Sequence, residues 1–374
     1  NMNILISIDS FKGSMTSMQA GNAAKKGILK AVPDAEAVVC PLADGGEGTT
    51  DALIEGMSGE KIELEVTGPL GETVSCYYGW LEESRTAVME MASAAGITLV
   101  SEKNPMMATT YGVGEMILDA AKRGCEKVII GIGGSATNDG GIGMLQAFGY
   151  QFLDKNGKDV GKGAAALGKV ERIIDDKVNP LIAKINFQVA CDVDNPLYGE
   201  IGATYIFGAQ KGVTDELKPV IDNGMKNFAD KTKQKLGVSC EKLPGAGAAG
   251  GLGFAFLAYL NAELTPGVQL IMQAAGIEEK IRTADIVVTG EGRIDSQTVM
   301  GKAPIGIAKI AKKYGKTVYA FAGNVSDDAC VCNQNGIDAF FQIARGVTTL
   351  EAAMQTETAM KNMELAVEQV FRVL

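Results

Sequence analysis

Four segments of the chain carry carboxylates, three of them together with glycines, in a way that suits phosphate and metal chemistry. They are residues 44–49, 131–141, 191–195 and 290–295. Glycine lets backbone amides approach a phosphate closely, and carboxylates hold a divalent cation or accept a proton. The chain contains no histidine, so the commonest general base and the commonest zinc ligand are both missing. The sequence therefore predicts a site that handles phosphate and Mg2+, with an aspartate or glutamate as its base.

Residues 9–14 place a lysine between an apolar run and a helix-like pattern. Lys12 and the neighbouring backbone amides could bind a phosphate at the start of that helix. The spacing of a Walker A loop is absent, so this is not a P-loop. The alternative is a solvated Lys12 beside an ordinary helix cap made by Ser14 or Thr16.

The segment 44–49 holds two acids at the end of a second apolar run. Asp44 and Glu47 repel each other unless a cation lies close. We predict that Asp44 binds Mg2+ or acts as a base and that Glu47 supports it. The alternative is an exposed turn that caps the next helix through Thr49.

Residues 131–143 are dense in glycine, with Ser135, Asn138 and Asp139 between them. The register does not match a dinucleotide-binding loop, and no ribose-binding acid follows at the expected distance. An anion-binding loop with Asn138 and Asp139 near a metal fits better, and a plain strand-to-helix turn is the alternative.

The third segment puts two aspartates at the tip of a buried strand. Asp192 and Asp194 could serve as metal ligands or as an acid and base pair. The pattern also resembles the nucleophile loop of haloacid-dehalogenase-type phosphatases, although Pro196 stands where that loop carries Thr or Val.

The fourth segment supplies cations. Arg293 could clamp a carboxylate or phosphate through two hydrogen bonds, and Lys302 follows nearby. The alternative is a surface pair between Arg293 and Asp295. Lys211 is a further cation within a glycine-rich stretch, and the glycines at 245–251 indicate either ligand contact or close helix packing.

Both ends of the chain alternate strand-like and helix-like patterns, as in a doubly wound parallel sheet. The expected strands are residues 4–8, 36–42, 285–289, 317–321 and 338–343, and the expected helices are 16–31, 49–57, 304–314 and 351–373. The middle begins with a hairpin over 61–66 and 73–80, followed by a helix over 112–123, strands over 127–130 and 186–190, and a buried helix within 246–260. We therefore expect an α/β domain of residues 1–65 plus 280–374, with a second α/β domain, 66–279, inserted into it.

Composition excludes several classes of protein. The net charge is -10, which argues against nucleic acid or an anionic membrane surface as a partner. The 7 cysteines are scattered, so reduced thiols are expected rather than disulfides or a zinc site. The chain starts with a strand-like segment, so we expect no signal peptide and a cytoplasmic protein. Oligomeric state stays open, with a homodimer as one option.

In order along the chain, these motifs resemble the bacterial two-domain glycerate kinase family. The matching segments cover nearly the whole sequence and are residues 9–13, 44–49, 109–112, 131–139, 192–197, 207–212, 244–251 and 290–295. The resemblance implies a flavodoxin-like first domain, an inserted second domain and an active site in the cleft between them. It also implies ATP-dependent phosphorylation of D-glycerate to 2-phosphoglycerate.

Combining the resemblance with the motifs gives a set of expected roles. Catalytic roles fall to Asp192, Asp44, Lys12 and Arg293, with Asp192 as the first choice of base and Asp44 the second. Metal ligands would be Asp192, Asp194 and Asp44. Substrate contacts would come from Asp9, Ser10, Lys12, Glu47, Arg293 and Asp295. Nucleotide phosphates would be bound by Gly133, Gly134, Ser135, Asn138, Gly245, Gly247 and Lys211. A Mg2+-dependent phosphatase with an aspartate nucleophile and a non-catalytic binding protein for small hydroxy acids are the alternatives.

Overall fold

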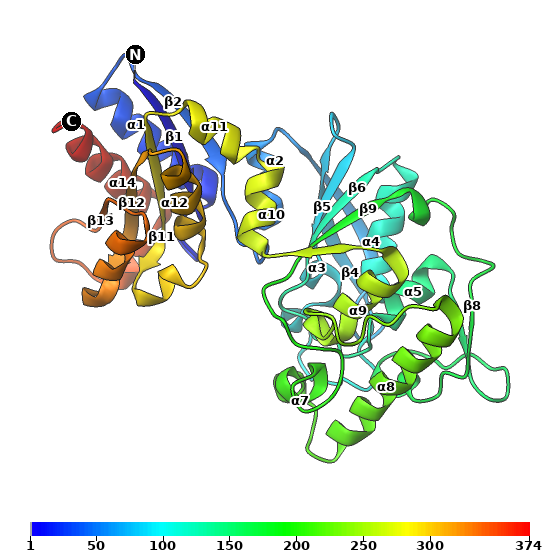
Figure 1. Cartoon of the computed structure of the whole chain (residues 1–374). Coiled ribbons are helices and arrows are strands. Elements are labelled where there is room, and N and C mark those ends of the chain that lie inside the picture. The colour runs from blue at the N-terminus through cyan, green and yellow to red at the C-terminus, as the bar shows by residue number, and fades with distance from the viewer. Residues whose placement is uncertain (1) are drawn as a thin grey trace. The chain divides into compact units, whose positions relative to one another are not determined.

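The computed structural model describes residues 2–374, which form two compact units. The first unit takes the chain up to Asp44, then Asp51–Gly59 and Val268–Leu374, and the second takes Gly45–Thr50 and Glu60–Gly267. In Figure 1 the first unit is therefore drawn in blue and in yellow to red, because it contains both ends of the chain. The sequence placed the corresponding boundaries near residues 65 and 280. Within residues 2–374 no helix combines the length and the apolar character needed to cross a membrane.

A five-stranded parallel sheet forms the centre of the first unit, in the order β13-β12-β11-β1-β2. Its strands are β1 (Asn3–Ile8), β2 (Glu36–Pro41), β11 (Ile286–Ile294), β12 (Thr317–Val325) and β13 (Ala339–Gln342). Counted along this unit alone, the spatial order is 2-1-3-4-5, which is the flavodoxin-like arrangement. The predicted fold class is confirmed.

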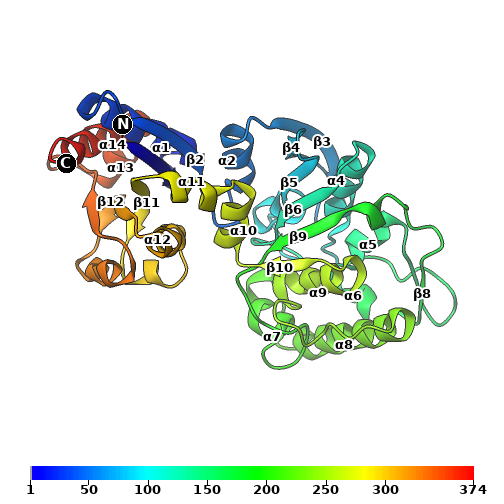
Figure 2. The same ribbon diagram turned by 45° about the horizontal axis from the view of Figure 1, so that its top comes forward.

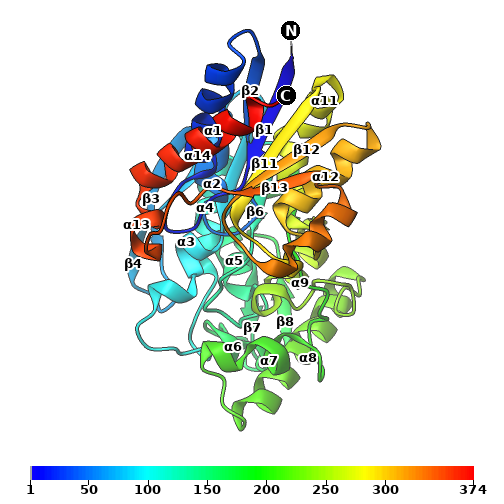
Figure 3. The same cartoon turned by 90° about the vertical axis from the view of Figure 1, so that its left-hand side faces the viewer.

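Alternate side chains of these strands face opposite layers of helices. Ile4 and Ile6 pack with α1 (Ser17–Ala31) and α14 (Thr356–Phe371). Leu5 packs with the layer on the other face. That layer comprises α10 (Gly267–Ala274), α11 (Ile277–Thr283) and α12 (Ala303–Lys313). Figure 3 shows α1 and α14 on one side of the sheet and α11 and α12 on the other, so the sheet is doubly wound.

Two predictions for the C-terminal part were wrong. The strand expected over residues 285–289 was too short, because β11 continues to Ile294 and pairs Glu291 and Arg293 with Ala322 and Asn324 of β12. That ladder satisfies the backbone hydrogen-bonding groups of both strands. The last predicted helix is also broken, into α13 (Leu350–Met354) and α14, by the extended backbone of Gln355. Helix α1 begins as expected, with a capping box between Thr16 and Gln19.

The second unit contains a six-stranded mixed sheet in the order β10-β9-β6-β5-β4-β3. Its strands are β3 (Glu60–Thr67), β4 (Thr73–Leu81), β5 (Thr86–Glu90), β6 (Lys127–Gly131), β9 (Asn186–Ala190) and β10 (Glu263–Thr265). The predicted hairpin is present as the antiparallel pair β3 and β4. Strands β5, β6, β9 and β10 run parallel, so their carboxyl ends share one edge (Figure 2).

Helices and a small antiparallel pair complete this unit. The helices are α3 (Ala92–Ala95), α4 (Tyr111–Lys122), α5 (Ile142–Phe148), α6 (Ala164–Leu167), α7 (Ala203–Phe207), α8 (Leu217–Leu236) and α9 (Ala248–Leu260), and α2 (Thr49–Gly56) crosses the division between the units. The pair is β7 (Gln151–Leu153) with β8 (Arg172–Ile174). Helix α9 confirms the expected buried helix, although residues 249–251 have left-handed backbone angles.

Candidate functional site

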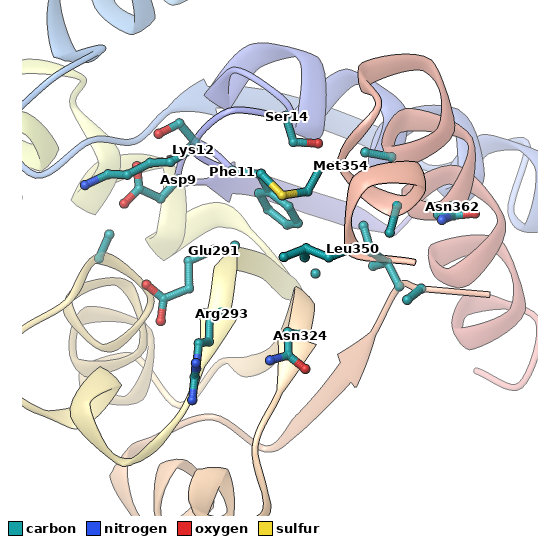
Figure 4. Close-up of a pocket in the computed structure, with 18 of the residues that line it drawn as sticks. Asp9, Phe11, Lys12, Ser14, Glu291, Arg293, Asn324, Leu350, Met354 and Asn362 are labelled. Atoms are coloured by element: carbon teal, nitrogen blue, oxygen red, sulfur yellow. Dashed lines mark hydrogen bonds between the residues drawn. The ribbon is translucent and has the colours of Figure 1, made fainter. Parts of the chain in front are cut away.

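A cavity of about 430 Å³ lies in the first unit, at the carboxyl ends of β1 and β11. Between these two strands the order of the sheet reverses, because β2 lies on one side of β1 and the later strands lie on the other. Crevices at such switch points are the usual ligand sites of open α/β sheets. Figure 4 shows side chains from both strand ends turned toward this cavity.

Five residues predicted from separate segments line this cavity together: Asp9, Ser10, Lys12, Asp44 and Arg293. They come from three stretches of sequence that the parallel pairing of β11, β1 and β2 brings side by side. Carboxylates and cations therefore line the same cavity, as phosphoryl chemistry requires.

The carboxyl group of Asp9 has an unusual environment. It accepts a hydrogen bond of 2.7 Å from the backbone N–H of Ser10. Burial, and then the negative charge of Asp44, raises the pKa of Asp9 to about 7; Glu291 adds to this, while the Ser10 hydrogen bond and Lys12 oppose it. A carboxyl group with a pKa near neutrality is suited to accept a proton at that pH.

Glu291 is a site residue to which the sequence analysis assigned no role. Its side chain is buried, and its Oε1 accepts a 2.7 Å hydrogen bond from the hydroxyl of Thr298. Burial raises the pKa of Glu291, and the bond from Thr298 partly opposes that shift. An acid flanked by two glycines at a strand end was the signal that could have identified it.

Asp295 connects the two cations on this side of the cavity. Its carboxylate lies 3.1 Å from Nε of Arg293 and 3.8 Å from Nζ of Lys302. It also accepts a bond from the backbone N–H of Gln297. Arg293 and Lys302 line the cavity whereas Asp295 does not, so Asp295 orients the cations.

In the second unit, Lys211 holds the glycine-rich loop that follows β6. Its Nζ donates to Oγ of Ser135 at 2.6 Å and to the carbonyl oxygen of Thr137 at 2.7 Å. The side chain is almost fully buried, and burial lowers the pKa of Lys211 to about 7, while Asp139 opposes the shift. Lys211 therefore anchors the loop from within the protein.

Asp139 and Asn138 are also turned inward. The carboxylate of Asp139 accepts from the backbone N–H and hydroxyl of Thr110, both at 2.9 Å, and from the N–H groups of Gly141 and Gly143. Burial raises the pKa of Asp139, and these bonds oppose that shift. Asn138 donates to Oγ1 of Thr204 at 3.1 Å.

The glycines of the second unit fall into two groups. Gly133 and Gly134 are exposed, and a Cβ at Gly133 would meet nothing within 4 Å. Gly245 and Gly247 are buried, and a Cβ at Gly247 would lie 2.2 Å from the carbonyl oxygen of Pro196. The first pair can present backbone amides to a ligand, whereas close packing explains the second.

Asp192 and Asp194 follow β9 at the carboxyl edge of the second unit's sheet. Oδ1 of Asp192 accepts a 3.0 Å bond from the N–H of Gly267. The segment carrying Glu47 packs at the same edge, because a Cβ at Gly45 would lie 2.6 Å from that of Ala190.

The residues present can supply only part of the coordination shell of Mg2+. Among residues 2–374, no group of three or more histidine, cysteine, aspartate or glutamate side chains is arranged to hold a metal. Mg2+ commonly takes one or two carboxylates and completes its shell with water and phosphate oxygens. Asp44, which lines the cavity, meets that smaller requirement. Of the predicted ligands, Asp44 belongs to the first unit and Asp192 and Asp194 to the second.

Comparisons with known proteins identify the family and the fold of the chain. The sequence pattern described as the Glycerate kinase family matches residues 4–374, and the chain belongs to that family. It is 47% identical over 354 residues to a glycerate kinase of Halalkalibacterium halodurans, covering 94% of this chain and 93% of the relative. It is 44% identical over 356 residues to a glycerate 2-kinase of Escherichia coli K12, covering 95% and 93%.

The structural comparison agrees. A crystal structure of a protein assigned as glycerate kinase 2 from Salmonella typhimurium LT2 superposes with a TM-score of 0.92 at 40% identity. The match covers 100% of this chain and 98% of the other.

Proposed function

We propose that this chain is a glycerate kinase, which transfers the γ-phosphoryl group of ATP to the 2-hydroxyl group of D-glycerate in the presence of Mg2+. The observation that carries the proposal is the lining of the switch-point cavity, where Asp9 and Glu291 lie with Lys12 and Arg293. Family membership and the names of the relatives support the same activity.

Phosphoryl transfer needs positioning and charge stabilisation more than covalent chemistry. Lys12 and Arg293 neutralise the moving phosphoryl group and the carboxylate of glycerate. Asp44 would hold Mg2+, which would neutralise charge on the phosphate oxygens. The exposed amides of Gly133 and Gly134 offer a further anion-binding surface.

The proton of the attacking hydroxyl needs an acceptor, and the chain has no histidine to serve. Asp192 and Asp44 are the acceptors that the sequence suggests. The environment of Asp9 suits the task better, since its pKa of about 7 is matched to neutral pH.

The test is release of ADP from ATP with Mg2+ and D-glycerate, beside controls that each omit one component. Turnover that needs all three supports the kinase, and NMR of the product distinguishes 2- from 3-phosphoglycerate. Hydrolysis of phosphoesters without ATP would instead support the phosphatase. Binding of glycerate without turnover, nucleotide or metal would support the binding protein.

A further inference from the structure

The switch-point cavity has an apolar half that the chemistry of glycerate does not use. Its lining there is Phe11, Ile343, Leu350, Met354 and Ala359, which we call the apolar half. Figure 4 shows Asp9, Lys12 and Glu291 toward one end, Leu350 and Asn362 toward the other, and Phe11 and Met354 between them. The whole cavity, about 430 Å³, lies in the size range of pockets for much larger ligands than a small hydroxy acid.

The exposure of Leu350 also indicates that the apolar half can contact a ligand larger than a small hydroxy acid. This side chain is 75% exposed although it lines the cavity, and it starts the short helix α13. Phe11 offers a flat aromatic surface, and Met354 supplies a flexible thioether that adapts to the shape of a ligand. An apolar, flat group would therefore gain contacts here that water cannot give.

Two amide side chains also line the cavity. Asn324 and Asn362 form no side-chain hydrogen bond within residues 2–374, yet each can both donate and accept. The polar end has the opposite character, with the cations Lys12, Arg293 and Lys302 near carboxylates. The cavity thus suits one molecule with a flat, polar-edged ring at one end and a metal-bound polyanion at the other.

We propose that the apolar half binds the base of the donor nucleotide, so that ATP lies in the first unit with its phosphates directed at Lys12, Arg293 and Lys302. This inference rests on the proposed function, because it takes the polyanion to be a nucleoside triphosphate. The sequence analysis instead expected the nucleotide phosphates to bind at residues 133–134 and 245–247. Close packing already accounts for Gly245 and Gly247.

The test is calorimetric binding of MgADP to the full-length protein without glycerate, comparing wild type with Leu350→Glu. The exposed position tolerates the substitution, and the lost apolar contact should weaken MgADP binding about tenfold. Val347→Glu is the matched control, since Val347 is fully exposed in the same segment and does not line the cavity. Inorganic tripolyphosphate, which has no base, should bind wild type and Leu350→Glu alike.

The outcomes separate this inference from the proposed function. Equal MgADP affinity in wild type, Leu350→Glu and Val347→Glu would overturn the inference while leaving any glycerate-dependent turnover intact. An equal loss for MgADP and tripolyphosphate would overturn it too, because the effect would then come from charge. A protein that fails to phosphorylate glycerate but loses MgADP binding only in Leu350→Glu would refute the proposed function and support the inference.

Discussion

The side-chain nitrogen of Lys211 lies 2.6 Å from the hydroxyl oxygen of Ser135 in a place from which water is almost wholly excluded. This contact fastens the loop after β6 to residue 211, which is distant in the sequence. A neutral amine can make both of the observed bonds, because Ser135 and the carbonyl of Thr137 are acceptors. The loop is therefore held without the need for a buried charge.

That contact predicts a stability that depends on pH. The folded-state pKa of Lys211, about 7, lies below the ordinary 10.5, so the unfolded chain binds more protons between these values. The free energy of unfolding of wild type should therefore rise relative to Lys211→Met as pH increases from 7 toward 10, by at most about 1.4 kcal/mol per pH unit. Urea unfolding of both proteins measures this. For the control Lys242→Met, at an exposed position, the difference in free energy of unfolding from wild type should not change with pH.

Asp9 should control the pH dependence of catalysis. Because its pKa is raised to about 7, the proportion of ionised base should fall below that pH, and kcat/KM should decline about tenfold per unit. Asp9→Asn should lower kcat by about 100-fold or more and remove this acidic limb. If kcat/KM of Asp9→Asn still declines at low pH, a group other than Asp9 is responsible for the decline.

The same shift has a consequence for stability. Folded Asp9 retains its proton to higher pH than the unfolded residue, whose pKa is 3.8, so the stability it contributes is lost as pH rises through about 7. We expect Asp9→Asn to gain stability relative to wild type between pH 4 and 8. Thermal unfolding across that range is the measurement, and a constant difference would contradict the raised pKa.

Asp192 offers a separate test of the proton acceptor. Asp192→Asn exchanges an ionised acceptor for an amide of similar size, and its bond from Gly267 can persist through the remaining oxygen. If Asp9 is the base, kcat of Asp192→Asn should stay within about tenfold of wild type and the pH profile should keep its shape. A drop as large as that of Asp9→Asn would return the base assignment to Asp192.

Backbone strain in α9 is concentrated at Ala249, which has φ 52° and ψ 47°. A non-glycine residue in this region costs about 1–2 kcal/mol, part of which a glycine recovers. Ala249→Gly should therefore stabilise the protein by about 0.5–1 kcal/mol in denaturant unfolding. Asn261→Gly is the control, because Asn261 also has positive φ but asparagine tolerates it, so its gain should be smaller.

Glycine substitutions can separate packing from ligand contact. Gly247→Ala should destabilise the protein by about 1–3 kcal/mol, because its Cβ would lie 2.2 Å from the carbonyl oxygen of Pro196. Gly133→Ala should leave stability unchanged, since its Cβ meets nothing within 4 Å. If the loop binds an anion, the latter variant should raise KM for a substrate. Unchanged kinetics would mean that Gly133 does not contact one.

Local patterns were enough to locate most secondary structure. Strand β1, helix α1 with its Thr16 cap and the β3–β4 hairpin follow from short-range apolar periodicity and turn residues, which act within a few positions. The doubly wound class followed from alternating strands and helices. The extension of β11 through Glu291 could not be predicted, because it depends on a neighbouring strand rather than on its own glycines.

The candidate residues could also be identified from the sequence, but their surroundings could not be predicted from it. The sequence singled out Asp9, Lys12 and Arg293 by type and position. Only the tertiary structure placed them on one cavity, because parallel pairing joins strands that are hundreds of residues apart in the chain. It also decided that Lys211 is buried, since the exclusion of water from a side chain depends on what packs around it.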